Sequence, residues 1–141
     1  MALRDYSLNY VEIDIGTVAS GAAADVDSGS FILPFGVTVT KAYLTVRANL
    51  TVRAGSYAIL TLQESGGTNI GTAIKITATA SGGTGNLVAP VWTDVTSIIQ
   101  PTTAISLSQD TSYYTKVTKQ GNGQAIVGLR LQLHFEPDAV S

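Results

Sequence analysis

The feature that most constrains the fold is an alternation of apolar and polar residues near the C-terminus, in the stretch AIVGLRLQLHFE at residues 125–136. Every odd-numbered position of this stretch is apolar, while the even positions from residue 128 onward are mostly polar. Successive side chains of a β-strand point to opposite faces, so the pattern predicts a strand that buries only its odd-numbered side, including Ala125 and Val127. One-sided burial is typical of antiparallel sheets, because parallel strands are usually covered on both faces.

Shorter stretches with the same period of two recur upstream. They predict strands at residues 11–15, 38–48, 57–63, 73–80 and 113–119, with a small-residue strand at Ala23–Asp27. Pro34 fits a strand end or a sheet edge, because proline cannot donate a hydrogen bond to a ladder. Helical periodicity is nearly absent, and we expect only one helical turn, capped by Asp94 and ended by Pro101.

The order and spacing of these strands predict the fold class. Gly121, Asn122 and Gly123 would form the turn of a hairpin joining Tyr113–Lys119 to Gln124–Phe135. About eight strands at a spacing of roughly 8–12 residues are typical of a sandwich or barrel. We therefore expect residues 1–141 to form one all-β domain, an antiparallel β-sandwich of the jelly-roll type, with a closed barrel or an immunoglobulin-like sandwich as alternatives.

The pentapeptide LTVRA occurs twice, at Leu44–Ala48 and at Leu50–Ala54. On one continuous strand the two copies would present the same face, with Arg47 and Arg53 about 20 Å apart at ~3.3 Å per residue. A break at Asn49 is the other interpretation, because asparagine tolerates turn geometry. We favour the break, with a strand from about Thr38 to Ala48 and a crossing segment that carries the second copy.

The composition excludes several classes of function. Charged residues make up 13% of the chain, the net charge is -2, and no basic block is present, so nucleic acid is a poor candidate partner. The chain has no cysteine, no signal-peptide pattern and no long apolar run, so we expect synthesis in a cytoplasm and no membrane span. A surface rich in hydroxyl groups and poor in charge is cheap to bury against another protein.

No pattern of catalytic or metal-binding residues stands out. His134, the only histidine, has no G-x-S-x-G motif to accompany it, so we expect a surface or interface residue. The stretch Asp25–Gly29 resembles half of a calcium loop but lacks the required glutamate, and a turn is the better interpretation. Glu12 and Asp14 share a strand face that we expect to be solvated. We therefore predict no catalytic residue, no cofactor and no metal, and a protein that is not an enzyme.

Aromatic and arginine residues are the candidates for contact with other proteins. The aromatic residues could belong to the core, to a subunit contact or to a sugar-binding platform, and the arginines to a solvated edge or to a contact. Residues 1–7 would form either an arm that reaches a neighbouring subunit or a frayed terminus. The candidate interface residues are Arg4, Tyr6, Tyr10, Arg47, Arg53, Tyr113, Tyr114, Arg130 and His134.

Taken together, the chain resembles the small jelly-roll capsid cement (decoration) proteins of tailed bacteriophages. The resemblance lies in a low-charge style rich in Thr, Gly and Ala rather than in a fixed signature. It is carried by residues 14–21 (DIGTVASG), 24–27 (ADVD), 32–34 (ILP), 37–46 (VTVTKAYLTV), 64–71 (ESGGTNIG) and the closing stretch 121–135.

The resemblance implies a structural role in the virion. Proteins of this kind are expected to form homotrimers on the outer capsid surface, where they bind the major capsid protein and clamp neighbouring capsomers. Modules of tail fibres and baseplates share the same style, so a carbohydrate- or receptor-binding module is the alternative.

Overall fold

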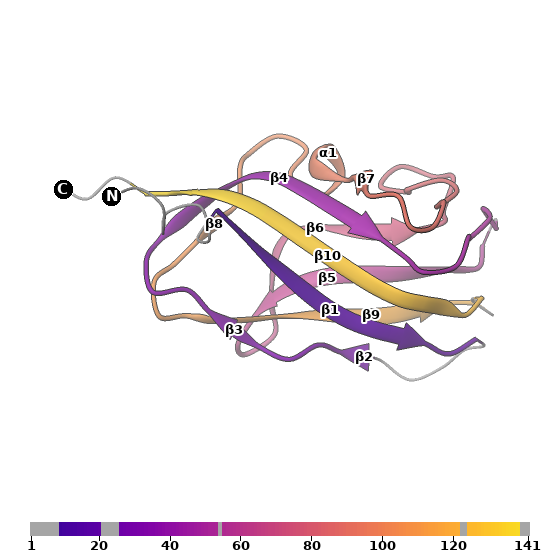
Figure 1. Ribbon diagram of the computed structural model, residues 1–141, viewed down its shortest axis with the longest axis horizontal. Coiled ribbons are helices and arrows are strands. Elements are labelled where there is room, and N and C mark those ends of the chain that lie inside the picture. The colour runs from indigo at the N-terminus through magenta and orange to yellow at the C-terminus, as the bar shows by residue number, and fades with distance from the viewer. Residues whose placement is uncertain (1–8, 21–25, 54, 122–123, 139–141) are drawn as a thin grey trace.

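The computed structural model describes residues 9–20, 26–53, 55–121 and 124–138, which form two antiparallel five-stranded sheets packed face to face (Figure 1). The strands are β1 (Tyr10–Val18), β2 (Val26–Asp27), β3 (Phe31–Ile32), β4 (Val37–Thr45), β5 (Tyr57–Glu64), β6 (Thr68–Ile76), β7 (Thr93–Asp94), β8 (Ser106–Leu107), β9 (Ser112–Gln120) and β10 (Ile126–Pro137). The all-β sandwich that the sequence predicts is confirmed.

The strand order is that of a jelly roll. In the first sheet the order is β1-β10-β4-β7, with β8 also paired to β4; in the second it is β2-β9-β5-β6, with β3 also paired to β9. The short strands β7 and β8 share one edge of β4, and β2 and β3 share one edge of β9, so ten strands fill eight positions. The first strand pairs with the last and β5 with β6, which is the nested pairing of a jelly roll.

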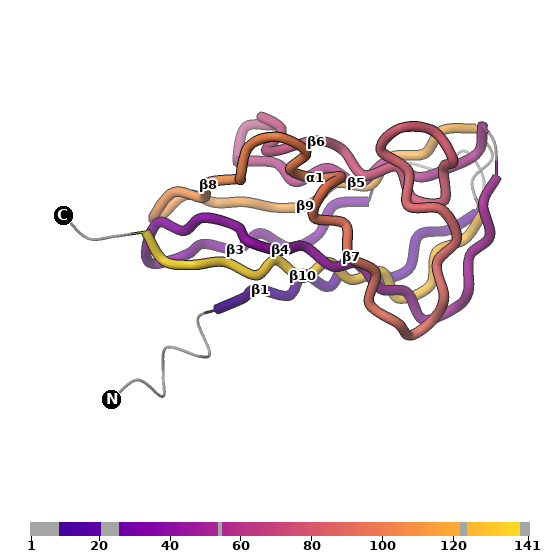
Figure 2. The backbone as a smooth tube through the Cα atoms, turned by 90° about the horizontal axis from the view of Figure 1, so that it is seen from above, coloured from indigo at the N-terminus to yellow at the C-terminus, as the bar shows by residue number. Residues whose placement is uncertain are grey.

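The core lies between the two sheets, which Figure 2 shows as separate layers. Leu129, Leu131 and Leu133 of β10 are fully buried and face Leu60 and Leu62 of β5 across this core. These alternating leucines confirm the predicted inner face of β5 and that of β10 from Leu129 onward. The outer faces follow from the same period, because each intervening side chain points away from the core.

The predicted hairpin between β9 and β10 is wrong. These strands lie in different sheets: β9 pairs with β5, whereas β10 pairs with β1 and β4. The segment around Gly121 therefore carries the chain from one sheet to the other. Alternation identifies a strand and its buried face, but it carries no information about which strand is the neighbour.

The predicted inner face of β10 is wrong at its beginning. Ile126 is buried and Val127 is exposed, whereas the alternation placed Ala125 and Val127 inside. The cause is an irregularity at Gly128, where the backbone adopts a φ of 61°. The extra residue shifts the alternation by one position between Ile126 and Leu129. Gly16 on β1 lies at the matching register shift, with a φ of 88°.

The two LTVRA copies have different structures. Leu44 and Thr45 of the first copy end β4, whereas the described part of the second copy, residues 50–53, forms no strand. Leu50 instead makes a single antiparallel bridge to Leu87, with both N–H···O distances at 2.9 Å. Asn49 marks the break, and its side-chain oxygen accepts a hydrogen bond from the N–H of Ala89 at 2.8 Å. The predicted break is confirmed, although the strand ends earlier than Ala48, which is exposed.

The remaining local predictions concern turns and edges. The single helical turn is confirmed as α1 (Thr96–Ile99), and Pro101 follows it as expected. The predicted cap is off by one position, because Val95 and not Asp94 is the N-cap residue, although the Asp94 carboxylate accepts a hydrogen bond from the N–H of Thr96. Pro34 lies two residues beyond the end of β3, a short strand at a sheet edge, as expected. Of the expected strand at residues 23–27, Val26 and Asp27 form β2, and residues 23–25 lie outside the described residues.

Within the described residues, no helix has the length and apolar character that a membrane crossing needs.

Candidate interaction surface on the first sheet

The outer face of the first sheet carries polar and aromatic side chains whose positions follow from the strand register. β10 lies between β1 and β4, with Tyr10 opposite His134 and Glu12 opposite Gln132 on one side, and Tyr43 opposite Gln132 on the other. Because the odd-numbered residues of β10 fill the core from Leu129 onward, the even-numbered residues of that part of the strand project to the outside. We call the residues that interact on this face the sheet-face cluster; they are Tyr10, Glu12, Tyr43, Trp92, Arg130, Gln132 and His134.

Two tyrosines enclose the ring of His134. Tyr10 stacks on it with 5.5 Å between ring centroids, and Tyr43 meets it edge to face at 5.2 Å. The Nε2 atom of His134 lies 2.6 Å from Oε1 of Gln132, within hydrogen-bond distance. These contacts on three sides hold the imidazole in one orientation on an exposed sheet face.

Glu12 connects the other members of the sheet-face cluster. One of its carboxylate oxygens accepts a hydrogen bond from Nη1 of Arg130 at 3.2 Å, and the other accepts one from Nε2 of Gln132 at 3.2 Å. The guanidinium carbon of Arg130 lies 5.6 Å from the ring centroid of Trp92. Since Gln132 also contacts His134, the contacts run without interruption from Trp92 to Tyr10.

A second polar group lies where β7 leads into α1. Asp94 accepts hydrogen bonds from the hydroxyl of Thr96 at 2.6 Å and from its backbone N–H at 2.9 Å, and it lies 3.8 Å from Nζ of Lys41. The hydrogen bond from the Thr96 hydroxyl, then that from its N–H, and the charge of Lys41 lower the pKa of Asp94 below its ordinary value. This carboxylate therefore stays ionised at the edge of the sheet face.

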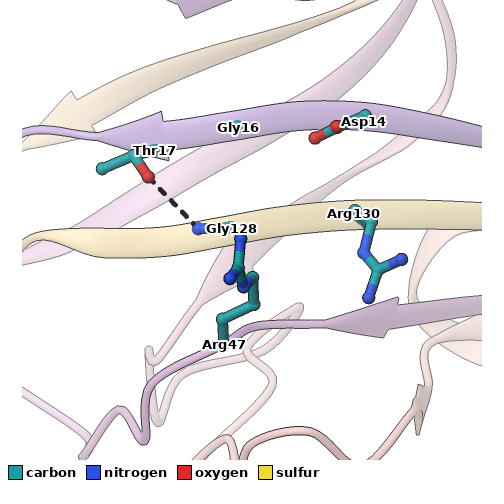
Figure 3. A pocket seen from close by; sticks show the side chains of 6 residues that line it. All are labelled: Asp14, Gly16, Thr17, Arg47, Gly128 and Arg130. Atoms are coloured by element: carbon teal, nitrogen blue, oxygen red, sulfur yellow. Dashed lines mark hydrogen bonds between the residues drawn. The ribbon is translucent and has the colours of Figure 1, made fainter.

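A polar depression of about 360 Å³ adjoins the cluster (Figure 3). It is open to solvent and lined by Asp14, Gly16, Thr17, Arg47, Gly128 and Arg130. Its floor contains the two glycine irregularities of β1 and β10, and the N–H of Gly128 donates a 3.4 Å hydrogen bond to the Thr17 hydroxyl. Arg130 belongs both to the depression and to the cluster, so the two features form one continuous surface.

The aliphatic part of Arg47 packs directly on Gly128. A Cβ atom added at Gly128 would lie 2.2 Å from Cδ and 2.6 Å from Cγ of Arg47, so any side chain there would displace the arginine. The backbone N–H of Arg47 donates to the carbonyl of Val127 at 2.8 Å. Within the part of the chain that the structure describes, the guanidinium group of Arg47 has neither an ion pair nor a hydrogen bond.

The structure separates the sequence-predicted interface residues into groups. Tyr10, Arg130 and His134 meet in the sheet-face cluster, and Arg47 lies beside them in the depression. Arg53 is exposed on the segment between β4 and β5, away from this surface. Arg4 and Tyr6 lie outside the described residues.

The two neighbouring tyrosines of β9 have different environments. Tyr113 is only 2% exposed, and its hydroxyl accepts a hydrogen bond from the N–H of Ser108 at 2.8 Å, so it is a core residue rather than an interface residue. Tyr114 points to the outer face of the second sheet, where its hydroxyl donates to Oε1 of Gln63 at 2.6 Å. Only Tyr114 is therefore placed to meet another molecule.

Sequence reasoning missed part of the cluster. It treated Glu12 as a solvated residue, did not single out Gln132, and left Tyr43 and Trp92 among three interpretations. The shared even-numbered face of β10 was visible in the sequence, but the pairing with β1 and β4 that brings these side chains together was not. Trp92 comes from an irregular segment, and no periodicity indicates its position over Arg130.

The described residues contain no group of three or more histidine, cysteine or acidic side chains arranged to hold a metal ion. Among the same residues, every buried side-chain nitrogen and oxygen atom has a hydrogen-bond partner. The chemical groups that the sheet-face cluster and the depression present to solvent are aromatic rings, guanidinium groups and carboxylates.

Comparison of the chain with protein-family models, with the sequences of curated proteins and with solved structures gave no significant match.

Proposed function

We propose that this protein is a structural virion protein: a capsid cement protein that binds the outer surface of a major capsid protein shell as a homotrimer and stabilises that shell. Made in the host cytoplasm, it would act without a cofactor. The resemblance of the sequence to small phage decoration proteins motivates the proposal, and the jelly-roll fold is compatible with it.

The observation that carries the proposal is the sheet-face cluster. Its tyrosine, tryptophan and arginine side chains are of the types that are enriched at protein interfaces and contribute most to binding. Contacts with neighbours already restrict them, as His134 is restricted between Tyr10 and Tyr43. Less side-chain entropy is therefore lost when a partner covers this face.

A trimer would strengthen the binding, because it carries three copies of this modest surface. Three linked copies that bind symmetric positions on a shell gain from effective concentration, because the second and third contacts form within one complex. Binding of this kind needs a rigid body and no reactive group. Two sheets packed around a continuous apolar core provide such a body.

Two measurements test the proposal. Light scattering on the purified protein should give three times the 14.6 kDa chain mass. Co-sedimentation with empty shells from the virus that encodes the chain should show saturable binding, and shells without the protein should break at a lower temperature. Failure to bind those shells would refute the cement function, and a strict monomer would refute the trimer.

A pair of matched substitutions examines which face binds. His134→Ala removes a half-buried ring from the outer face of the first sheet, whereas Tyr114→Ala removes one from the outer face of the second. We expect His134→Ala to weaken shell binding or trimer formation, and Tyr114→Ala to leave both near wild type. The opposite result would assign the interface to the second sheet.

The alternative is a carbohydrate- or receptor-binding module of a tail fibre or baseplate. The polar depression favours it, since about 360 Å³ lies within the size range of small-ligand sites. However, Trp92 is not among the residues that line the depression, and Arg130 lies over its ring. Specific hits on a glycan array, lost on Arg47→Gln, would favour this alternative over the cement function.

A further inference from the structure

Arg47 combines two properties that a built recognition site has. Its position is fixed, because its backbone is bonded to Val127 and its aliphatic part rests on Gly128. Its charge is available, since its guanidinium makes no ion pair with any residue that the structure describes. A charged group that is already held in place loses little conformational entropy when it binds.

We propose that the depression receives a carboxylate side chain, an aspartate or glutamate, from the major capsid protein, and that Arg47 is the cation that binds it. The identity of this partner rests on the proposed function, whereas the carboxylate chemistry rests on the depression alone.

The charges that line the depression favour a carboxylate. Arg47 and Arg130 both contribute guanidinium groups, and Glu12 occupies only Nη1 of Arg130. Guanidinium groups present paired N–H donors that match the two oxygens of a carboxylate. A carboxylate bound at Arg47 would thus also approach the remaining donors of Arg130.

Asp14 lines the side of the depression opposite Arg47. It lies on β1, whereas Arg47 follows β4, so the two residues flank β10 from opposite sides (Figure 3). A ligand with negative charge alone would be repelled there. A peptide segment offers a carboxylate to Arg47 and, from a nearby backbone N–H or hydroxyl, a donor to Asp14, so it fits both sides.

The shape of the depression favours a protruding protein side chain over a free small acid. Small-ligand sites usually enclose most of the ligand, and this depression is open to solvent. The sheet-face cluster includes the same Arg130 and extends from there to Tyr10. A macromolecule could cover that wider face while one of its acidic side chains entered the depression.

The duplicated LTVRA sequence provides a matched control for the first experiment. Arg47→Gln and Arg53→Gln remove the same charge from the same pentapeptide, but only Arg47 lines the depression. In co-sedimentation with shells, we expect Arg47→Gln to weaken binding roughly tenfold or more, as loss of a charge-assisted hydrogen-bond pair would, and Arg53→Gln to change it less than about twofold. Arg47→Lys should restore part of the affinity.

A second experiment needs no shell and so separates this inference from the proposed function. The isolated protein is titrated with sodium acetate and with a capped Gly-Glu-Gly peptide, with sodium chloride at equal ionic strength as control. The NMR signals of the Gly128 N–H and the Arg47 side-chain N–H report binding. We expect saturable shifts with both carboxylates, stronger with the peptide, none with chloride, and their loss in Arg47→Gln.

The outcomes distinguish the two proposals. Carboxylate-specific shifts in a protein that binds no shell would support the site and refute the cement function. Equal responses to acetate and chloride would overturn the carboxylate site. Shell binding unchanged in Arg47→Gln would overturn the proposal that the shell supplies the carboxylate. Dissociation of the trimer in Arg47→Gln, detected by light scattering, would overturn the assignment to the shell, because the carboxylate would then come from a neighbouring copy.

Discussion

The guanidinium group of Arg130 lies over the indole ring of Trp92, 5.6 Å from its centroid, while its Nη1 donates to Glu12 at 3.2 Å. Trp92 is the only tryptophan of the chain, so fluorescence excited selectively at tryptophan reports on the surroundings of this one ring. We expect Arg130→Gln to change the emission intensity or maximum, because the cation leaves the ring. Unfolding in urea should show a loss of about 0.5–2 kcal/mol, the sum expected for one exposed cation–π contact and one surface ion pair.

Arg53→Gln serves as the control for that experiment. It removes an exposed arginine that has no place in the contact, so both the emission and the unfolding midpoint should stay at wild-type values. An Arg130→Gln spectrum that coincides with the wild-type spectrum would show that the arginine does not lie on the indole in solution.

The tyrosine pair of β9 predicts unequal losses of stability. Tyr113 is buried and stacks at a tilt on Phe31 with 5.8 Å between ring centroids, so Tyr113→Ala should destabilise by about 3–5 kcal/mol through lost burial and a cavity. Tyr114 is half-buried and bonded to Gln63, so Tyr114→Ala should cost clearly less. Urea unfolding of both variants measures this difference, and equal losses would contradict the inward orientation of Tyr113.

The period-two pattern predicted the fold class because it follows from which face of each strand is buried. It found the inner faces of β5 and most of β10, where Leu60 and Leu131 fill the core. It failed where the backbone departs from a regular strand, as at Gly128, and wherever pairing mattered, as in the false hairpin of β9 and β10. Pairing depends on contacts between segments far apart in sequence, and alternation does not encode those contacts.

The candidate surface, too, could be predicted only in part from the sequence. The period-two pattern placed Tyr10, Arg130 and His134 correctly on the outer face of their strands, and their side-chain chemistry made them candidates for an interface. Composition could not show that Glu12 joins two of the strands, because that contact spans more than a hundred residues. Nor could it distinguish the two arginines of the repeated pentapeptide, since only the fold places one of them on Gly128.

Gly128 should tolerate no side chain, for two reasons that act together. Its φ of 61° is costly for residues with a Cβ, and the added carbon would collide with Arg47. We expect Gly128→Ala to destabilise by roughly 1–3 kcal/mol in urea unfolding. Gly29→Ala is the matched control, because nothing lies within 4 Å of its added Cβ, and it should change stability by less than about 0.5 kcal/mol.

The lowered pKa of Asp94 predicts a pH dependence of stability with a definite sign. The folded state favours the ionised carboxylate, because Thr96 donates two hydrogen bonds to it and Lys41 lies nearby. The carboxylate of the unfolded chain should have the ordinary value of about 3.8. The contribution to stability is therefore complete above that value, and it is lost as the pH falls through the lower pKa of the folded state.

Two variants identify the cause of this shift. An NMR titration of the side-chain carboxyl carbon of Asp94 should give a pKa below 3.8 in the wild type. Thr96→Val removes the largest contribution, the hydroxyl hydrogen bond, and should raise the pKa towards the ordinary value. Lys41→Met removes the weaker attraction to the Lys41 charge and should raise it less. A larger rise in Lys41→Met than in Thr96→Val would show that charge attraction, rather than the Thr96 hydrogen bonds, keeps this carboxylate ionised.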